Sequence, residues 1–252
     1  IAALIILICV LARPQIHERE KEVETKAVDI ILVLDVSRSM RAEDFQPANR
    51  LEVAKEEAVK FIEGRSDDRI GLIIFAKNAI TQCPLTIDHD VLIKFVEQVQ
   101  IGRIEGDGTA IGIALGTAVN RLMDSSAKSK VVILLTDGEN NAGQIDPGTA
   151  ADLAAQFDVK VYTIGVGKGG KVPFPKDDPI YGRSYTYTNV EIDEETLQEI
   201  AQKTNGQYFR ARDQKGLEEI YTKIASLEKT EIKIRHYATH VEIFHYFLVC
   251  FL

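Results

Sequence analysis

The sequence predicts an α/β domain with a Rossmann-like, doubly wound and mainly parallel sheet, one short antiparallel edge strand, and helices on both faces. Short uninterrupted apolar runs, such as residues 28–35, are typical of strands that are covered on both faces. These runs alternate with segments of helical periodicity, which favours parallel strands joined by crossover helices. The 252 residues, 45% of them hydrophobic, suffice for one sizeable domain with additional segments.

The apolar runs give the predicted strands in chain order. We expect four strands buried on both faces, at residues 28–35, 69–76, 130–137 and 159–167. Residues 79–85 predict the antiparallel edge strand, ended by Pro84. A further short strand is predicted at residues 207–211.

Amphipathic segments lie between these runs. In residues 49–64, Leu51, Ala54, Ala58 and Phe61 recur on one face, as in a helix that packs against a sheet. Further helices are predicted at residues 88–99, 109–125, 148–157, 193–206 and 215–228.

The segment 168–190 does not fit this alternation. It is rich in Gly, Pro and Tyr, and it predicts an inserted loop or hairpin at the surface. It overlaps the stretch GVGKGGKV at 165–172, which satisfies two glycine-rich patterns of nucleotide-binding loops. Both patterns need a helix to follow, whereas Pro173 and Pro175 come next, so we expect no nucleotide site here.

Both ends of the sequence are apolar. Residues 1–12 and 241–252 are each too short to cross a bilayer, which takes about 20 residues. We interpret them as the end of one transmembrane helix and the start of another, joined to the domain at 29–228 by linkers at 13–28 and 229–240. Buried core segments are the alternative for the apolar ends, and the polar segment 13–28 is also compatible with an edge strand.

Charge and cysteine content argue against a nucleic-acid partner, a disulfide framework and a cysteine metal site. The net charge is −8 and the sequence has no basic run, which argues against a nucleic-acid partner. Cys9 and Cys250 lie in the apolar ends, so Cys83 stands alone in the central part. The sequence therefore has neither a disulfide framework nor a C-x-x-C metal pair.

Oxygen-bearing side chains stand where the predicted strands end. Asp35, Ser37 and Ser39 come at the end of the first buried strand, Asp137 ends the third, and Thr109 stands at the start of a helix. In open parallel sheets ligands bind beyond the carboxyl ends of the strands, so we expect these side chains to meet at one edge. Two carboxylates and three hydroxyls suit a hard divalent cation, with Mg²⁺ the natural choice and Mn²⁺ or Ca²⁺ as alternatives.

The three hydroxyls predict how such a cation would be used. If they bind the cation directly and the carboxylates act partly through water, the cation keeps much of its positive charge. It would then attract an anionic group, so we expect a protein partner that offers an Asp or a Glu. Arg38, Tyr181 and Tyr185 are the candidate partner-binding residues at the rim of the site.

The pattern D-x-S-x-S, followed by a distant Thr and a later T-D-G, resembles the signature of the von Willebrand factor type A domain. The resemblance covers roughly residues 29–228. It implies a metal-ion-dependent adhesion site at the five residues named above, and a binding module rather than an enzyme. Arg38 stands where many members of the family have Gly, which leaves the ligands intact and adds a charge at the rim.

Four further segments resemble the BatA branch of bacterial membrane proteins, which is associated with aerotolerance operons and with MoxR-type AAA+ ATPases. They are ARPQ at 12–15, AEDFQPANRLEVAK at 42–55, DDPIYGRSY at 177–185 and LEKTEI at 227–232. The resemblance implies a protein of the bacterial inner membrane whose type A domain faces the periplasm. It also implies other Bat-type membrane proteins and a MoxR-type ATPase as partners, in cell-envelope stress or aerotolerance.

A metal-dependent hydrolase that uses the same site is the alternative function. Metal-bound water can act as a nucleophile, but the reaction also needs a general acid or base. The five histidines lie away from the strand-end loops, whereas Glu43, Asp44, Asp107 and Glu139 lie near them in sequence. Phosphatase and esterase assays with and without Mg²⁺ distinguish the two functions.

Overall fold

The computed structural model describes residues 15–45, 48–178, 182–190, 192–228 and 231–242. The chain divides into two compact units, of which the larger comprises Ala27–Thr230 and the smaller comprises the two ends of the chain.

The smaller unit contains a two-stranded antiparallel sheet. Strand β1 (Gln15–Lys26) pairs with strand β10 (Glu231–Glu242), from Gln15 opposite Glu242 to Lys26 opposite Glu231. The segment 13–28 therefore contains a strand, which was the alternative to a linker, and the segment 229–240, which we expected to be a linker, contains one as well. Each strand finds its partner more than 200 residues away along the chain, so the local pattern of either segment does not reveal the pairing.

The predicted membrane spans fall almost entirely on residues outside those that the structure describes. This holds for all of 1–12, and for 241–252 except its first two residues, which end β10. Among the described residues, no helix has both the length and the apolar character that a membrane span requires.

The larger unit is built on a six-stranded sheet in the order β4-β3-β2-β5-β6-β9. Its strands, in chain order, are β2 (Val28–Asp35), β3 (Arg69–Phe75), β4 (Ala79–Thr86), β5 (Ser129–Thr136), β6 (Val159–Val166) and β9 (Tyr208–Ala211). Only β4 is antiparallel to its neighbour, which confirms the predicted mainly parallel sheet with an antiparallel edge strand. Pro84 lies inside β4 rather than ending it, because an edge strand tolerates the missing N–H.

The order of the strands creates a topological switch point. Strand β2, the first strand of this sheet in chain order, lies in its middle. The chain then adds β3 and β4 on one side of β2, and β5, β6 and β9 on the other. The strand order therefore reverses between β2 and β5. In doubly wound sheets, the crevice at such a point, beyond the carboxyl ends of the strands, is where ligands bind.

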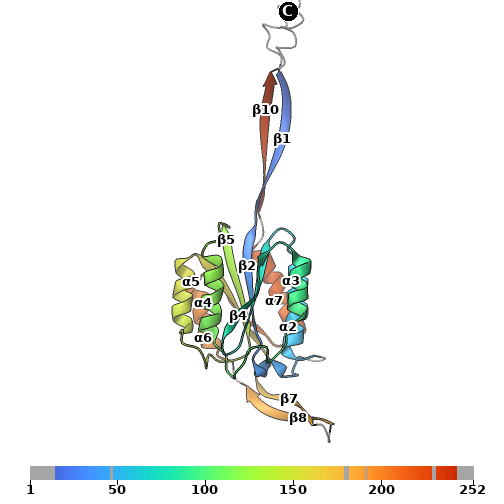
Figure 1. Cartoon of the computed structure of the whole chain (residues 1–252), viewed down its shortest axis with the longest axis vertical. Helices are drawn as coiled ribbons and strands as arrows, with labels where there is room; N and C mark the ends of the chain where they lie inside the picture. Colours follow the sequence, from blue (N-terminus) through green and yellow to red (C-terminus); the bar gives the residue numbers. More distant parts are fainter. Residues whose placement is uncertain (1–14, 46–47, 179–181, 191, 229–230, 243–252) are drawn as a thin grey trace, which may run out of the picture. The chain divides into compact units, whose positions relative to one another are not determined.

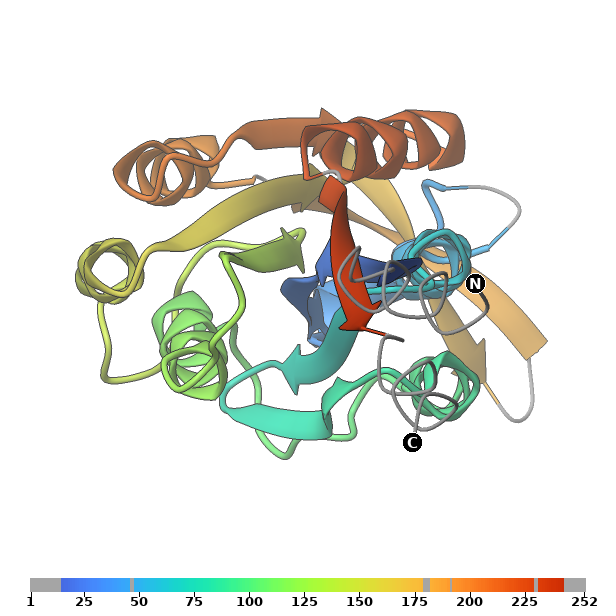
Figure 2. The same cartoon turned by 90° about the horizontal axis from the view of Figure 1, so that it is seen from above.

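Helices cover both faces of this sheet (Figure 1), and Figure 2 shows the resulting layers. One core cluster packs α2 (Arg50–Glu63), α3 (His89–Glu97) and α7 (Gln214–Leu227) against one face. The other packs α4 (Ile111–Leu122), α5 (Pro147–Gln156) and α6 (Glu194–Lys203) against the opposite face. Strand β2 serves both clusters by alternation, since Ile30 and Leu32 belong to the first and Ile31 and Val33 to the second.

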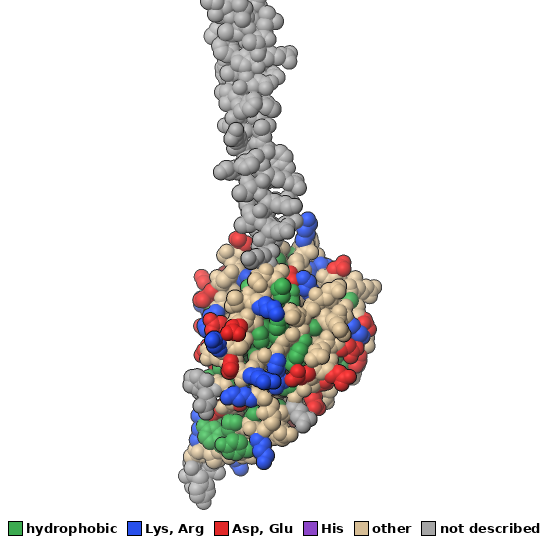
Figure 3. Space-filling view, turned by 180° about the vertical axis from the view of Figure 1, so that it is seen from behind, with side chains coloured by type: hydrophobic (Ala, Val, Ile, Leu, Met, Phe, Trp, Pro, Cys, Tyr) green, Lys and Arg blue, Asp and Glu red, His purple; other side chains and the backbone are tan. Residues whose placement is uncertain are grey.

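The inserted segment forms a hairpin. Strands β7 (Gly170–Asp178) and β8 (Gly182–Val190) pair antiparallel in a sheet of their own. Nearly all of β8 is exposed, including Tyr185 and Tyr187, at 49% and 68% of their surface. In Figure 3, hydrophobic and basic side chains gather on this hairpin, at the lower left.

Candidate metal site at the switch point

The two carboxylates of the candidate site stand on neighbouring strands at the switch point. Asp35 is the last residue of β2, and Asp137 directly follows the last residue of β5. Both side chains are fully buried, with no accessible surface. Two carboxylates are thus enclosed at the edge of the sheet where the fold places a ligand.

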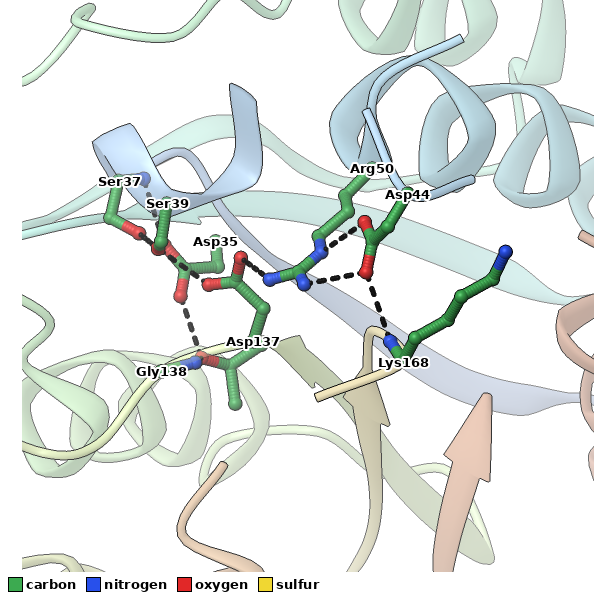
Figure 4. Close-up of polar contacts among 9 residues, drawn as sticks. Asp35, Ser37, Ser39, Asp44, Arg50, Asp137, Gly138 and Lys168 are labelled. Atoms are coloured by element: carbon green, nitrogen blue, oxygen red, sulfur yellow. Dashed lines mark hydrogen bonds and ion pairs between the residues drawn. The ribbon is translucent and has the colours of Figure 1, made fainter. Parts of the chain in front are cut away.

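The two serines join the carboxylates through a chain of hydrogen bonds (Figure 4). They flank the start of a short 3₁₀ helix, η1 (Arg38–Arg41), which bends the backbone back over the sheet edge. The Oγ atoms of Ser37 and Ser39 are 2.9 Å apart, and Ser39 Oγ donates to Oδ1 of Asp137 at 2.6 Å. The hydroxyls therefore face the carboxylates rather than the solvent.

Asp35 is held in place by two donors. Its Oδ1 accepts a hydrogen bond from the backbone N–H of Ser37 at 2.8 Å, and its Oδ2 accepts one from Thr136 Oγ1 at 2.6 Å. Each carboxylate oxygen of Asp35 thus has a partner within the protein, which fixes the orientation of the side chain.

Thr109 completes the candidate set from the third loop. It precedes α4 and is 4% exposed. Its backbone N–H donates to Asn141 Oδ1 at 2.8 Å, and its carbonyl oxygen accepts from the N–H of Asn141 at 3.1 Å. A Cβ atom at Gly138 would lie 3.2 Å from Thr109 Oγ1, so the hydroxyl lies directly against the loop that follows Asp137. The structure thus brings all five predicted residues to one edge.

Two asparagines that the sequence analysis did not single out lie in the loop after β5 and bind the loop of Thr109. Asn141 binds the backbone of Thr109, and Asn140 Oδ1 accepts the N–H of Ile111 at 2.9 Å, at the start of α4. The Asn pair at 140–141 is typical of a loop, but its backbone partners lie 29 and 32 residues away and cannot be read from the local sequence. Asn141 thus holds Thr109, and Asn140 the start of α4, against the loop that follows Asp137.

A buried arginine is the main feature of the site that sequence reasoning missed. Arg50, the first residue of α2, is fully buried, and its Nη1 donates to Asp137 Oδ2 at 2.6 Å. Its Nε and Nη2 donate to the two carboxylate oxygens of Asp44, at 2.8 and 2.7 Å. A weak signal existed, because a cation in the first turn of a helix opposes the helix dipole and needs a reason to be there.

The charges of the site are not balanced within the protein. The pKa of Asp35 is raised from 3.8 to about 7. Burial is the largest cause, and the negative charge of Asp137 is the second. Burial also raises the pKa of Asp137, although the Arg50 charge opposes it. At Asp44, burial likewise raises the pKa, but the hydrogen bonds from Arg50 and Lys168 outweigh it and the net shift is downward.

The donor set fits a hard divalent cation. A cation between Asp35 and Asp137 would offset the cost of burying both carboxylates, and it would screen the repulsion from Asp137 that adds to the rise in the pKa of Asp35. In the part of the chain that the structure describes, no three His, Cys, Asp or Glu side chains cluster as metal ligands. A cation at this edge would therefore need the hydroxyls of Ser37, Ser39 and Thr109 as ligands in addition to the two carboxylates.

Of the three predicted rim residues, Arg38 lies beside the site and Tyr185 lies on the β7–β8 hairpin. Arg38 is exposed and forms an ion pair with Asp107, from Nε to Oδ1 at 2.9 Å. Beside the site lies a cavity of about 260 Å³ whose lining includes Ser37, Arg38 and Gly108. Tyr185, on β8, donates a hydrogen bond to Glu43 Oε2 at 3.1 Å. Tyr181 lies outside the described residues.

Comparison with known proteins places this geometry in a family. The sequence profile of the von Willebrand factor type A domain matches residues 29–223. An uncharacterized protein of Borreliella burgdorferi is 32% identical over 250 residues, which cover 98% of this chain and 72% of that protein. A UPF0353 protein of Nocardia farcinica is 26% identical over 80% of this chain, which spans 63% of its length.

Solved structures agree with the profile. BatB from Bacteroides thetaiotaomicron has a TM-score of 0.68 and 32% identity, covering 80% of this chain and 98% of that one. An aerotolerance-related membrane protein from Bacteroides fragilis has a TM-score of 0.67 and 31% identity, covering 78% and 98%. A mussel byssus matrix protein, whose structure is described with zinc in its metal-ion-dependent adhesion site (MIDAS) motif, shares the fold at 22% identity. The TM-score is 0.61, and the match covers 88% of this chain and 50% of that one. By profile, fold and sequence similarity, the chain belongs to the von Willebrand factor type A domain family.

Proposed function

We propose that this chain carries a membrane-anchored type A domain that binds Mg²⁺ through the five residues at the switch point and recruits a partner protein through an Asp or Glu of that partner. The observation that supports this proposal most is the continuous set of oxygen donors. Two fully buried carboxylates and a chain of hydroxyls converge at the edge where a doubly wound sheet takes its ligand.

Hydrogen bonds within the chain limit how much negative charge the carboxylates give to a cation. Both oxygens of Asp35 accept hydrogen bonds, and Asp137 shares its charge with Arg50. Ser39 donates its single proton to Asp137 and therefore accepts from Ser37, which leaves one lone pair of the Ser39 oxygen for ligation. A Mg²⁺ bound there keeps positive charge and supplies a coordination position for an oxygen from outside.

Arg38 would add a second positive charge for an acidic partner. It stands between Ser37 and Ser39, and its side chain is 78% exposed. Asp107, its ion-pair partner, is 67% exposed, and such exposed pairs contribute at most about 1 kcal/mol. An acidic segment of a partner therefore displaces Asp107 from Arg38 at little cost.

A pull-down with the full chain as bait tests metal-dependent recruitment. We expect a partner that is retained in Mg²⁺, released by EDTA, and lost with Thr109→Ala, because that change removes a direct hydroxyl ligand. Thr117→Ala is the matched control, since the Thr117 hydroxyl bonds within α4, to the carbonyl oxygen of Ile113. The mechanism is wrong if the same partner, identified by mass spectrometry, is retained equally in EDTA.

The similarity to BatB and to an aerotolerance-related membrane protein supports a membrane location. We place the type A domain on the periplasmic side of the bacterial inner membrane, as a BatA-like protein that acts with other Bat-type proteins and a MoxR-type ATPase. The full-length protein is then expected to sediment with membranes and to require detergent for release. Its type A domain should be cleaved by protease in spheroplasts; protection until the membrane is broken would contradict the periplasmic side.

Binding rather than catalysis is the role that the neighbouring acids favour. Asp44 is paired with Arg50, Glu43 with Arg183, and Asp107 with Arg38, so three of the four candidate general bases already have a cationic partner. Phosphatase and esterase assays decide between the two roles: hydrolysis that requires Mg²⁺ and disappears with Asp35→Ala would establish the hydrolase instead.

A further inference from the structure

Arg50 lies between the candidate metal site and the root of the β7–β8 hairpin. On one side its Nη1 donates to Oδ2 of Asp137, while Oδ1 of the same carboxylate accepts from Ser39. On the other side its Nε and Nη2 hold both oxygens of Asp44 (Figure 4). One planar guanidinium thus connects the loop after β5 with the loop before α2.

The link continues from Asp44 into the inserted segment. Asp44 Oδ2 also accepts the backbone N–H of Lys168 at 2.9 Å, two residues before β7 begins. Gly167 has a φ of +133°, and a Cβ atom there would lie 2.6 Å from Arg50 Nη2, so the backbone passes directly over the guanidinium. The N–H of Glu43 donates to the carbonyl oxygen of Pro173 in β7 at 3.0 Å. Both the root and the first strand of the hairpin are therefore attached to the segment around Asp44.

This arrangement requires arginine. A buried cation is costly unless its donors are all paired, and an apolar side chain of similar size commonly stabilises a core as well or better. Lysine carries the same charge on a single nitrogen and lacks the planar fork that holds two carboxylates in fixed directions. The pairing of three guanidinium nitrogens with two carboxylates points to orientation rather than to stability as the role of Arg50.

We propose that Arg50 is a positioning residue of the metal site that also attaches the hairpin to it. Its hold on Oδ2 of Asp137 turns Oδ1 toward Ser39 and the metal-binding edge. Its hold on Asp44 sets the root of the hairpin against the same edge, so that the metal and the hairpin form one binding surface. The inference rests on the proposed metal binding, and by linkage a cation that engages Asp137 steadies the hairpin as well.

The test compares three variants of the full chain with Mg²⁺ alone as the probe. Arg50→Lys keeps the charge without the fork, and Asp44→Asn weakens the link to the hairpin. Arg65→Lys is the matched control, because Arg65 is also buried and ion-paired, with Asp68, but binds the carbonyl oxygens of Ala225 and Glu228 away from the site. Thermal melting reports the general loss of stability in all three.

Two readouts separate positioning from stability. Calorimetry is expected to show Mg²⁺ affinity reduced about 10-fold or more in Arg50→Lys and unchanged in Arg65→Lys, as for other residues that orient a metal ligand. Hydrogen exchange of residues 168–190 is expected to slow with Mg²⁺ in the wild type and in Arg65→Lys, but not in Asp44→Asn. Equal affinity in Arg50→Lys and wild type, or full Mg²⁺-dependent protection in Asp44→Asn, would overturn the proposal.

Failure of the proposed function gives a different result. If the wild type binds no Mg²⁺, the metal site itself is wrong. Hydrogen exchange measured without metal then tests whether Arg50 and Asp44 attach the hairpin. Faster exchange of 168–190 in Arg50→Lys and Asp44→Asn than in Arg65→Lys supports the attachment of the hairpin, whereas equal exchange in the three variants refutes it.

Discussion

Replacement of Asp35 by alanine is expected to abolish Mg²⁺ binding. The change removes one of the two carboxylates at the switch point, and it frees Ser37 and Thr136, which donate to Asp35. Ser37 is itself a proposed ligand, so the geometry of the hydroxyls is lost together with the charge. Isothermal titration calorimetry with Mg²⁺, or electron paramagnetic resonance with Mn²⁺, measures the loss.

Asp107→Asn is the matched control for this experiment. Asp107 is an acid at the rim of the same edge, but it is exposed, is paired with Arg38, and lies outside the proposed ligand set. Its replacement is expected to leave Mg²⁺ affinity nearly unchanged. If Asp35→Ala binds Mg²⁺ as tightly as the wild type does, the site has been assigned to the wrong residues.

The affinity for Mg²⁺ is also expected to depend on pH. The pKa of Asp35 in the metal-free protein is about 7, well above the ordinary 3.8, so the proton competes with the cation for this carboxylate below about pH 7. Affinity therefore falls as the pH is lowered from 8 to 6, by up to about tenfold per pH unit once Asp35 is protonated. Titrations at pH 8, 7 and 6 measure the trend.

Gly112→Ala is expected to destabilise the larger unit severely. A Cβ atom at Gly112 would lie 2.0 Å from the carbonyl oxygen of Ile145 and 2.8 Å from its carbonyl carbon. Both atoms belong to backbone, so α4 or the loop before α5 must shift to make room. Overpacking of this kind typically costs up to about 3 kcal/mol. The thermal midpoint is then expected to fall by roughly 5–10 °C.

Gly116→Ala, one turn further along α4, provides the opposite expectation. A Cβ atom there would make an ordinary contact, 3.7 Å from Cδ1 of Ile145. Because alanine favours a helix interior over glycine, this variant is expected to gain about 0.5–1 kcal/mol. Calorimetric melting of both variants measures the two thermal midpoints, which are expected to fall in Gly112→Ala and to rise in Gly116→Ala. A rise in both midpoints would show that α4 approaches the loop less closely than described.

The residues of the candidate site were predictable because their signal is local. Asp35, Ser37 and Ser39 follow an apolar run that is recognisable as a buried strand, and Asp137 follows another. The rule that parallel strands present their carboxyl ends at one edge then brings the two loops together without knowledge of any contact. The sheet was predictable for the same reason.

Arg50 and Asp44 could not be assigned in this way. Their roles depend on the contact between Arg50 and Asp137, which are 87 residues apart, and nothing in the surrounding sequence identifies that partner. In sequence, Arg50 is one more charged residue at the start of an amphipathic helix. The pairing of β1 with β10 was missed on similar grounds, since each strand is defined only by the other.

Two side-chain contacts at the switch point join parts of the chain that are far apart in sequence. The bond between Thr136 and Asp35 joins residues 101 apart, and that between Arg50 and Asp137 joins residues 87 apart. Contacts of such sequence separation carry a large loop-closure entropy and slow folding. During synthesis, the D-x-S-x-S segment emerges well before β5, and until then its partners Thr136 and Asp137 are absent. With the proposed metal site, the nascent chain would be able to hold a cation only after residue 137 has left the ribosome, so cation binding would report that the two halves of the sheet have paired.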